Sequence, residues 1–153
     1  MVKTANKVLG MINRSFVYKT RETILPLYKS LVRPHIEYCI QAWRPHLVKD
    51  ISLIESVQHR ATRMITSLKG LSYEQRLNAL KLTSLETRRM RGDLIEVFKI
   101  LKGFEDVNSS KFFKLADTNL RGHNLKLFKS RFCTNIGKFT FCNRVIEQWN
   151  SLL

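Results

Sequence analysis

Acidic residues are scarce in this chain, whose 153 residues include 12 Asp and Glu against 27 Lys and Arg. The formal net charge is therefore +15, and the pI lies near 10.2. A positive excess of this size favours a polyanionic partner, of which nucleic acid is the commonest. The composition leaves one alternative open, a basic surface that is solvated and has no partner.

The chain also has few cysteines and no long apolar run. Its three cysteines are an odd number, which argues against the disulfide scaffold of a secreted protein. Lys29 and Arg33 interrupt the most hydrophobic stretch, so no transmembrane helix is expected. Lys3 and Lys7 stand where a signal peptide needs apolar residues. We therefore expect an intracellular protein, nuclear or cytoplasmic, that is neither secreted nor embedded in a membrane.

The residue constellations of common active sites are missing as well. The sequence has no Gly-rich phosphate loop, no HExxH or CxxC spacing, and no pair of carboxylates placed for a cleft. His123, Cys133 and Cys142 are the conceivable metal ligands, but their spacing fits no common zinc module. We predict no catalytic residue and no metal site, which leaves binding as the chemistry to examine.

Apolar residues recur at helical spacing over most of the chain, which predicts a mainly α fold built on a helical bundle. A first short helix is expected over residues 2–12. Residues 23–46 form the stretch around which the bundle is organised, as two amphipathic pieces joined at Pro34. Thr23 is expected to cap the first piece and Pro34 to open the second, with Arg33 outside the helical region.

Capping signals mark the helices that follow. Asp50 is expected to cap the next helix. Two capping boxes, at residues 72–75 and 83–86, should open a short helix and a long one. On the long helix, Arg88 and Arg89 are expected to point to solvent.

Composition divides the chain into three parts. Residues 1–103, which end on Gly103, are expected to form a helical domain, and the polar, Ser-containing segment 104–110 a linker. Residues 111–153 should form a small basic subdomain with short strands or turns and a final helix over about 142–152. Phenylalanines alternate with basic residues in this subdomain. They fit either base stacking or a small core, and we prefer the core.

The candidate phosphate contacts fall into three groups of basic residues. The first group surrounds the first two helices, the second lies on and after the helix that follows Asp50, and the third lies in the basic subdomain. The candidates are Lys3, Lys7, Arg14, Lys19, Arg21, Lys29 and Arg33 in the first group, Arg60, Arg63 and Lys69 in the second, and Arg121, Lys126, Lys129 and Arg131 in the third.

Beyond composition, the residues themselves carry a resemblance. LPLYKSLVRPHIEYCIQAWRPH closely resembles the segment after the polymerase palm in reverse transcriptases of non-long-terminal-repeat (LINE-type) retrotransposons, the jockey-like and chicken-repeat-like elements. TANKVLGMINRSF is similar to the start of the family's thumb, and RVIEQWNSLL to its closing RV-x-x-x-WN-x-LP. The likeness runs in order over nearly the whole chain, and it departs from the family where Leu153 replaces the last proline.

The resemblance implies the thumb and C-terminal region of an RNA-directed DNA polymerase without its palm. The family's catalytic aspartates hold two metal ions in a Tyr/Phe-x-Asp-Asp turn, and this sequence has no Asp-Asp pair. No catalytic residue is carried over, Mg²⁺ is expected only in the palm, and the chain is not expected to be active by itself.

The implied partners are an RNA/DNA template–primer and the palm and fingers of the parent polymerase. A thumb holds the duplex by its backbone, so the contacts should be phosphate contacts that are largely independent of sequence. Lys29 and Arg33 are the first residues expected to make them. The alternative is a protein-interaction or structural module derived from a co-opted or degenerate element remnant.

Overall fold

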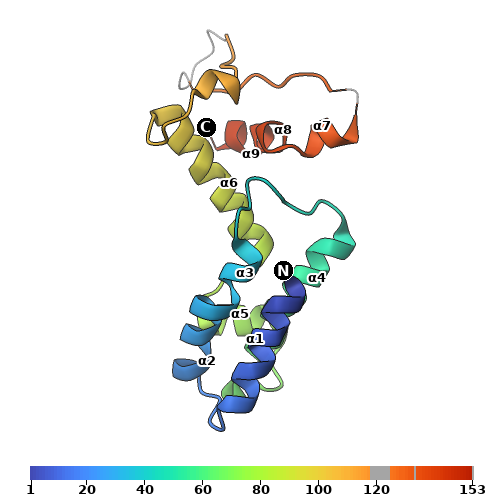
Figure 1. Ribbon diagram of the computed structural model, residues 1–153, viewed down its shortest axis with the longest axis vertical. Helices are drawn as coiled ribbons and strands as arrows, with labels where there is room; N and C mark the ends of the chain where they lie inside the picture. The colour runs from blue at the N-terminus through green and yellow to red at the C-terminus, as the bar shows by residue number, and fades with distance from the viewer. Residues whose placement is uncertain (118–124, 133, 153) are drawn as a thin grey trace. The chain divides into compact units, whose positions relative to one another are not determined.

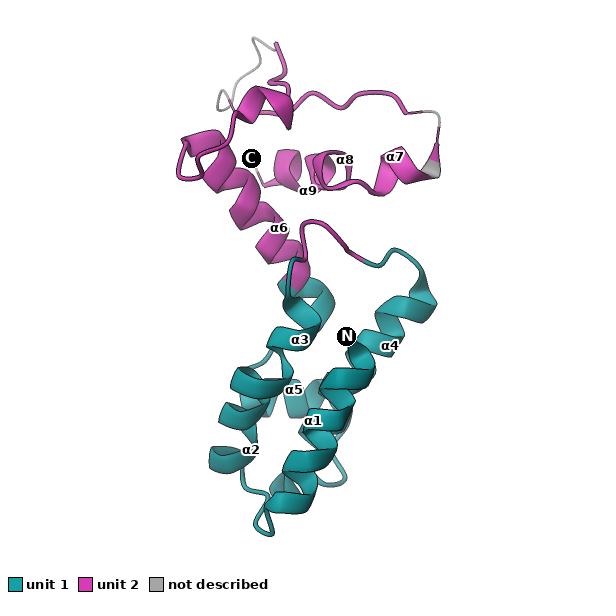
Figure 2. Cartoon of the chain, viewed as in Figure 1, with its two compact units in different colours: residues 1–39, 45–88 teal, residues 40–44, 89–153 magenta. Residues whose placement is uncertain are grey.

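The structure, a computed structural model, describes residues 1–117, 125–132 and 134–152 (Figure 1). The described part is mainly helical, as predicted. It forms two compact units, residues 1–39 with 45–88 (unit 1) and residues 40–44 with 89–153 (unit 2), shown in Figure 2. Among the described residues, no helix combines the length and apolar character that crossing a membrane requires.

The division between the units falls inside the long helix α6 (Leu85–Lys102), and not at the segment 104–110 that was expected to be a linker. That segment folds back onto the end of α6. The backbone N–H of Phe104 donates to the Lys99 carbonyl at 2.9 Å, and Lys99 Nζ lies 2.9 Å from Glu105 Oε1. These contacts attach the start of the segment to the helix before it, within unit 2.

Unit 1 is a bundle of short helices in which α1 packs against α4, η1 and α3. The longer helices bury apolar residues on one face, among them Leu9 of α1, Val57 of α4 and Leu80 of α5. Its elements are α1 (Val2–Ser15), α2 (Arg21–Leu27), the π-helix η1 (Tyr28–Val32), α3 (Pro34–Glu37), α4 (Val48–Arg63), the 3₁₀ turn η2 (Thr66–Leu68) and α5 (Tyr73–Leu80).

Two sequence predictions for unit 1 are confirmed. The first helix, expected over 2–12, is α1, and it buries Ala5, Leu9 and Ile12. The capping box at the start of α5 is present: the Gln75 backbone N–H donates to Ser72 Oγ at 3.3 Å, and the Ser72 N–H donates to Gln75 Oε1 at 2.9 Å. Both reciprocal bonds satisfy N–H groups that the helix leaves without an internal acceptor.

The first half of the stretch 23–46 differs from the prediction. α2 begins at Arg21 with Thr20 at the N-cap, so Thr23 is not the cap, and Pro26 lies inside the helix. Proline has no N–H for the helical ladder, and the chain continues as the π-helix η1. Arg33 was predicted to leave the helical region, but its φ of −61° and ψ of −39° are helical. Its N–H donates to the Tyr28 carbonyl at 2.9 Å, which holds it in the π-turn.

The second half is shorter than predicted. Pro34 does open α3, but that helix ends at Glu37, because Tyr38 is extended and Cys39 has a φ of 54°. A helix of L-residues does not continue through such a positive φ. Similarly, α4 begins at Val48, so Asp50 is not its cap but lies in its first turn, where a carboxylate complements the helix dipole.

The long helix α6 also differs from its predicted start and exposure. Ser84 Oγ accepts a hydrogen bond from the Thr87 N–H at 3.1 Å, so the capping residue is one position later than the predicted box at 83–86. Arg88 is exposed as predicted, whereas Arg89 is buried with 2% of its surface exposed. Its guanidinium lies 5.7 Å from the centroid of the Trp43 ring, an aromatic partner for the buried cation.

Unit 2 packs short helices and irregular segments around α6 from Arg89 onward. In its described part no β-strand forms, and the short strands that were expected are reduced to one bridge between Leu115 and Leu127. The expected final helix is broken in two at Val145. The elements after α6 are η3 (Ser109–Lys111), α7 (Asn135–Phe139), α8 (Phe141–Arg144) and α9 (Ile146–Ser151). Their core consists of Val97, Ile100, Phe113, Leu127, Val145, Ile146 and Trp149.

The Trp-Asn pair of α9 explains how the irregular segment before it is held. Trp149 Nε1 donates to the Leu125 carbonyl at 2.8 Å. The Asn150 amide makes two bonds to Leu127, accepting from its N–H and donating to its carbonyl, each at 2.9 Å. Side chains here replace the backbone ladder that a neighbouring strand would supply.

A buried ion-pair cluster joins three segments of unit 2. Asp93, 1% exposed, accepts two bonds from Arg144, from Nε at 3.1 Å and from Nη2 at 3.0 Å. Arg44 Nη1 adds a third contact at 3.1 Å. Arg144 Nη2 also donates to the carbonyls of Ile40 and Gln41. The carboxylate is thus fully enclosed by donors, as a buried charge requires.

Candidate nucleic-acid interface

Four basic side chains from three segments of unit 1 line one surface hollow of about 440 Å³. We call it the basic hollow. Lys19 comes from the connection between α1 and α2, Arg60 and Arg63 from the last turn of α4, and Lys69 from the chain after η2. The remaining lining residues are uncharged: Asn13, Val17, Met64 and Thr66.

Local contacts bring these segments together. The Thr66 backbone N–H donates to the Lys19 carbonyl at 3.0 Å, which ties the α1–α2 connection to the chain that follows α4. Arg60 and Arg63 are three residues apart on one helix, a spacing that places them on the same side. Arg60 Nη1 donates to Asn6 Oδ1 of α1 at 3.2 Å. The hollow therefore depends on the packing of α1 against α4.

Among the described residues, no carboxylate lines the basic hollow. Within the described residues, the side chains of Lys19, Arg63 and Lys69 form no ion pair. Arg60 and Arg63 also lie where the helix dipole favours cations, which gives them a structural role. Lys19 and Lys69 lie outside helices, so the dipole does not account for them.

The pKa of His59 is lowered, in part by the positive charges around it. Burial is the main cause that lowers this pKa, and the charges of Arg76 and Arg63 lower it further. Arg76 Nη2 lies 3.1 Å from His59 Nδ1, and because an arginine can only donate, Nδ1 is the acceptor of a neutral ring. The imidazole also stacks on Tyr73 with 4.0 Å between the ring centroids.

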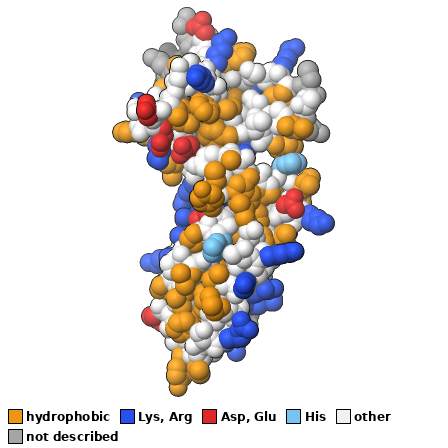
Figure 3. Space-filling model, in the orientation of Figure 1, with side chains coloured by type: hydrophobic (Ala, Val, Ile, Leu, Met, Phe, Trp, Pro, Cys, Tyr) orange, Lys and Arg blue, Asp and Glu red, His pale blue; other side chains and the backbone are white. Residues whose placement is uncertain are grey.

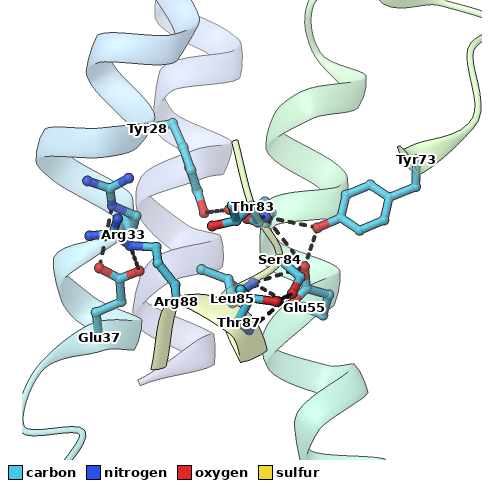
Figure 4. A network of polar contacts seen from close by, with 11 residues as sticks. Tyr28, Arg33, Glu37, Glu55, Tyr73, Thr83, Ser84, Leu85, Thr87 and Arg88 are labelled. Atoms are coloured by element: carbon cyan, nitrogen blue, oxygen red, sulfur yellow. Dashed lines mark hydrogen bonds and ion pairs between the residues drawn. The ribbon is translucent and has the colours of Figure 1, made fainter. Parts of the chain in front are cut away.

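A buried polar network joins α4, the helix that carries Arg60 and Arg63, to η1, α5 and the start of α6 (Figure 4). Tyr28 Oη donates to Gln58 Oε1 at 2.8 Å, and Gln58 Nε2 lies 3.0 Å from Tyr73 Oη and 3.0 Å from the Thr83 carbonyl. Glu55 accepts from Tyr73 Oη and, at 3.0 Å, from the Leu85 N–H that starts α6. Burial raises the pKa of both tyrosines, so their hydroxyls stay protonated and donate.

The remaining residues of the first predicted group lie apart from the basic hollow. Arg33, one of the two first choices, pairs with Glu37 at 3.5 Å, and Arg88 approaches the same carboxylate at 2.6 Å (Figure 4). Its charge is therefore compensated, which makes it a weaker phosphate ligand than Lys29. Five residues of the group are exposed: Lys3, Lys7, Arg14, Arg21 and Lys29. Figure 3 shows Lys and Arg side chains gathered along one edge of unit 1, over α1 and α4.

The described members of the third predicted group do not line a common hollow with one another. Lys129 pairs with Glu147, Lys126 is half-buried, and Arg131 is exposed. Arg121 lies outside the described residues, as do His123 and Cys133. The preferred interpretation, that the phenylalanines of this subdomain form a core, holds only in part: Phe113 is in the core and Phe141 packs against it, whereas Phe112 and Phe128 are exposed.

Sequence reasoning found all four residues of the basic hollow but assigned them to two groups. It missed the apolar connection at Val17 and Tyr18 that adjoins them, since these residues carry no charge. Among the described residues, no group of three or more His, Cys, Asp or Glu side chains is placed to hold a metal ion. None of the family models, curated proteins or solved structures with which the chain was compared matches it.

Proposed function

We propose that this chain is the thumb and C-terminal region of a retrotransposon RNA-directed DNA polymerase, and that it binds an RNA/DNA template–primer by its phosphates. The ordered resemblance of its segments to that family supports the first part. The basic hollow supports the second part, because four cations from three segments converge there without an acidic residue in the lining.

The chemistry of the hollow suits a phosphodiester backbone. Arg60 and Arg63 offer planar guanidinium groups that can bind two phosphate oxygens at once, and Lys19 and Lys69 add point charges. A phosphate among them relieves the mutual repulsion of the cations and releases counterions from the nucleic acid. Such contacts orient a duplex without reading its bases, and the role of this chain is to hold the template–primer for catalytic residues supplied by the palm.

The salt dependence of binding tests this function. The affinity of the purified chain for a labelled RNA–DNA hybrid should fall linearly with salt on logarithmic axes, by about 0.9 per phosphate contact for a B-form duplex. Fluorescence anisotropy over a range of ionic strengths measures this slope. Absence of binding at low salt would overturn the proposal, and so would an affinity that salt leaves unchanged.

A matched pair of variants locates the contacts. Arg63→Gln should lower the affinity for the hybrid and reduce the salt slope by about one. Lys49→Gln removes the same charge from an exposed position in the first turn of the same helix, about 20 Å from Arg63 at about 1.5 Å per residue. Equal effects of the two variants would mean that net charge, and not the hollow, determines binding.

The alternative, a protein-interaction module, predicts a different result for the same chain and the same Arg63→Gln variant. Partners captured by the chain would then survive nuclease treatment, and Arg63→Gln would weaken their capture without any salt-dependent binding of the hybrid. This outcome would favour an acidic protein as the partner of the basic hollow.

A further inference from the structure

The connection between α1 and α2 exposes apolar side chains next to the basic hollow. Val17 is 86% exposed and Tyr18 is 83% exposed, and Phe16 before them is also exposed. Single exposed apolar residues are ordinary, but consecutive ones beside a phosphate site need an explanation. Figure 3 shows apolar side chains at the end of unit 1 where this connection lies.

A second hollow, of about 630 Å³, lies at this connection and adjoins the basic hollow. We call it the loop hollow. The two hollows share Val17, Lys19 and Thr66 in their linings. The volume lies within the range of about 300–1,000 Å³ typical of small-ligand sites. The lining of the loop hollow consists of Val17, Tyr18, Lys19, Thr20, Arg21, Glu22, Thr66 and Ser67.

We propose that the loop hollow binds an unpaired nucleotide, with Tyr18 stacking on its base while the basic hollow holds the adjoining phosphates. This inference rests on the proposed function, because it extends the same nucleic-acid strand from one hollow into the next. The occupant is a single-stranded extension of the template–primer, of either RNA or DNA, because every base has a face on which an aromatic ring stacks.

The distribution of charge explains why a base, and not another phosphate, belongs in the loop hollow. Glu22 lines it, and the pKa of this carboxyl is lowered by its backbone hydrogen bond and by Thr20, so it carries a negative charge. With Glu22 beside Lys19 and Arg21, the loop hollow is less positive than the basic hollow, so phosphates are favoured in the basic hollow and an uncharged base can occupy the loop hollow. Aromatic side chains flanked by cations, here Lys19 and Arg21, form the usual platform for single-stranded nucleic acid.

The connection is also anchored at its end nearest the stacking residue. The Thr66 N–H donates to the carbonyl of Lys19, the residue next to Tyr18, at 3.0 Å. Thr20 Oγ1 lies 3.2 Å from Thr23 Oγ1 of α2. An anchored backbone reduces the conformational entropy that binding would otherwise cost.

Two hybrids that differ only in a single-stranded extension test the proposal. The wild-type chain should bind the extended hybrid at least about fivefold more tightly than the blunt one, because stacking contributes about 1–3 kcal/mol per base. Tyr18→Ala should abolish this difference and leave the affinity for the blunt hybrid unchanged. Tyr18→Phe, which keeps the aromatic ring, should retain it.

Two controls separate stacking from general effects. An extension whose sugars carry no bases adds phosphates alone, so it should give at most a small gain in affinity compared with the base-bearing extension. Tyr38→Ala changes another strongly exposed tyrosine of unit 1, outside both hollows, and should leave the gain intact. Because Tyr18 is exposed, its substitution should not lower the melting temperature, which circular dichroism checks.

The outcomes distinguish this inference from the proposed function. Salt-dependent binding of the blunt hybrid without any gain from the extension would overturn the stacking role and leave phosphate binding standing. A gain that persists in Tyr18→Ala would also overturn it. No binding of either hybrid at low salt would overturn both.

Discussion

The two units use basic side chains in opposite ways. In unit 2, Arg44 and Arg144 surround the buried carboxylate of Asp93. In unit 1, Arg63 and Lys69 line an exposed hollow that has no carboxylate in its lining. The first arrangement satisfies its charges internally and stabilises the fold, whereas the second leaves them available to an external anion.

This difference shows that the net charge of +15 does not by itself indicate nucleic-acid binding, because the basic residues have different roles. Some of the positive residues serve the core, among them Arg89, which is 2% exposed. A residue is informative about binding only when its surroundings lack the carboxylate that would neutralise it. By this criterion the basic hollow is a stronger site than the pair of Arg33 and Glu37.

The largest expected effect on stability comes from removing the buried carboxylate of unit 2. Asp93→Ala leaves two partly buried arginines, Arg44 and Arg144, without their shared carboxylate, and it should reduce the free energy of unfolding by as much as about 3–5 kcal/mol. Urea denaturation followed by circular dichroism measures the change. Asp106→Ala, at an exposed position, is the control and should alter stability by less than about 0.5 kcal/mol. A loss below about 1 kcal/mol for Asp93→Ala would show that the cluster is not needed for stability.

A smaller loss is expected from the polar network that joins α4 to η1, α5 and the start of α6. Glu55→Ala removes the acceptor of the Leu85 N–H and of Tyr73 Oη, and leaving such groups unsatisfied costs about 1–3 kcal/mol. Glu74→Ala, on the exposed face of α5, removes the same charge without these bonds. Denaturation midpoints compare the two variants. If both lost the same stability, the network would contribute nothing specific.

Much of the fold of unit 1 follows from local signals in the sequence. The apolar spacing of Ala5, Leu9 and Ile12 and the pairing of Ser72 with Gln75 depend only on neighbours a few residues away. The π-helix after Pro26 could not be predicted in this way, because apolar spacing does not distinguish its wider hydrogen-bond pattern from that of an α-helix. The whole resemblance to retrotransposon polymerases stays a prediction.

Long-range pairing explains the other differences. Arg89 was predicted to be exposed to solvent, because the sequence does not show that the Trp43 ring lies against its guanidinium. The ion pair of Asp93 could not be predicted either, because its partner Arg144 is 51 residues away in the sequence. The basic hollow could be predicted only in part for the same reason: Lys19 joins Arg60 and Arg63 through the packing of α1 on α4. Residue types were visible in the sequence, but their surroundings were not.

The smallest expected effect concerns the electrostatic field of unit 1. Because burial and then Arg76 and Arg63 lower the pKa of His59, the unfolded chain takes up a proton at a higher pH than the folded chain. Stability due to His59 is therefore fully present above its ordinary pKa of 6.5, and it decreases as the pH falls from there toward the lowered pKa. His59→Gln should remove this part of the pH dependence of unfolding.

The same histidine can report on the basic hollow directly. Arg63→Gln removes one of the charges that depress the His59 pKa, so the pKa measured by NMR titration should rise toward its ordinary value. The rise should be partial, because burial is the larger cause and is unchanged. Binding of the RNA–DNA hybrid to the wild-type chain should move the pKa in the same direction, since a phosphate in the hollow offsets the charge of Arg63. A His59 pKa unaffected by the hybrid, under conditions where the hybrid is bound, would place the phosphate contacts outside the basic hollow.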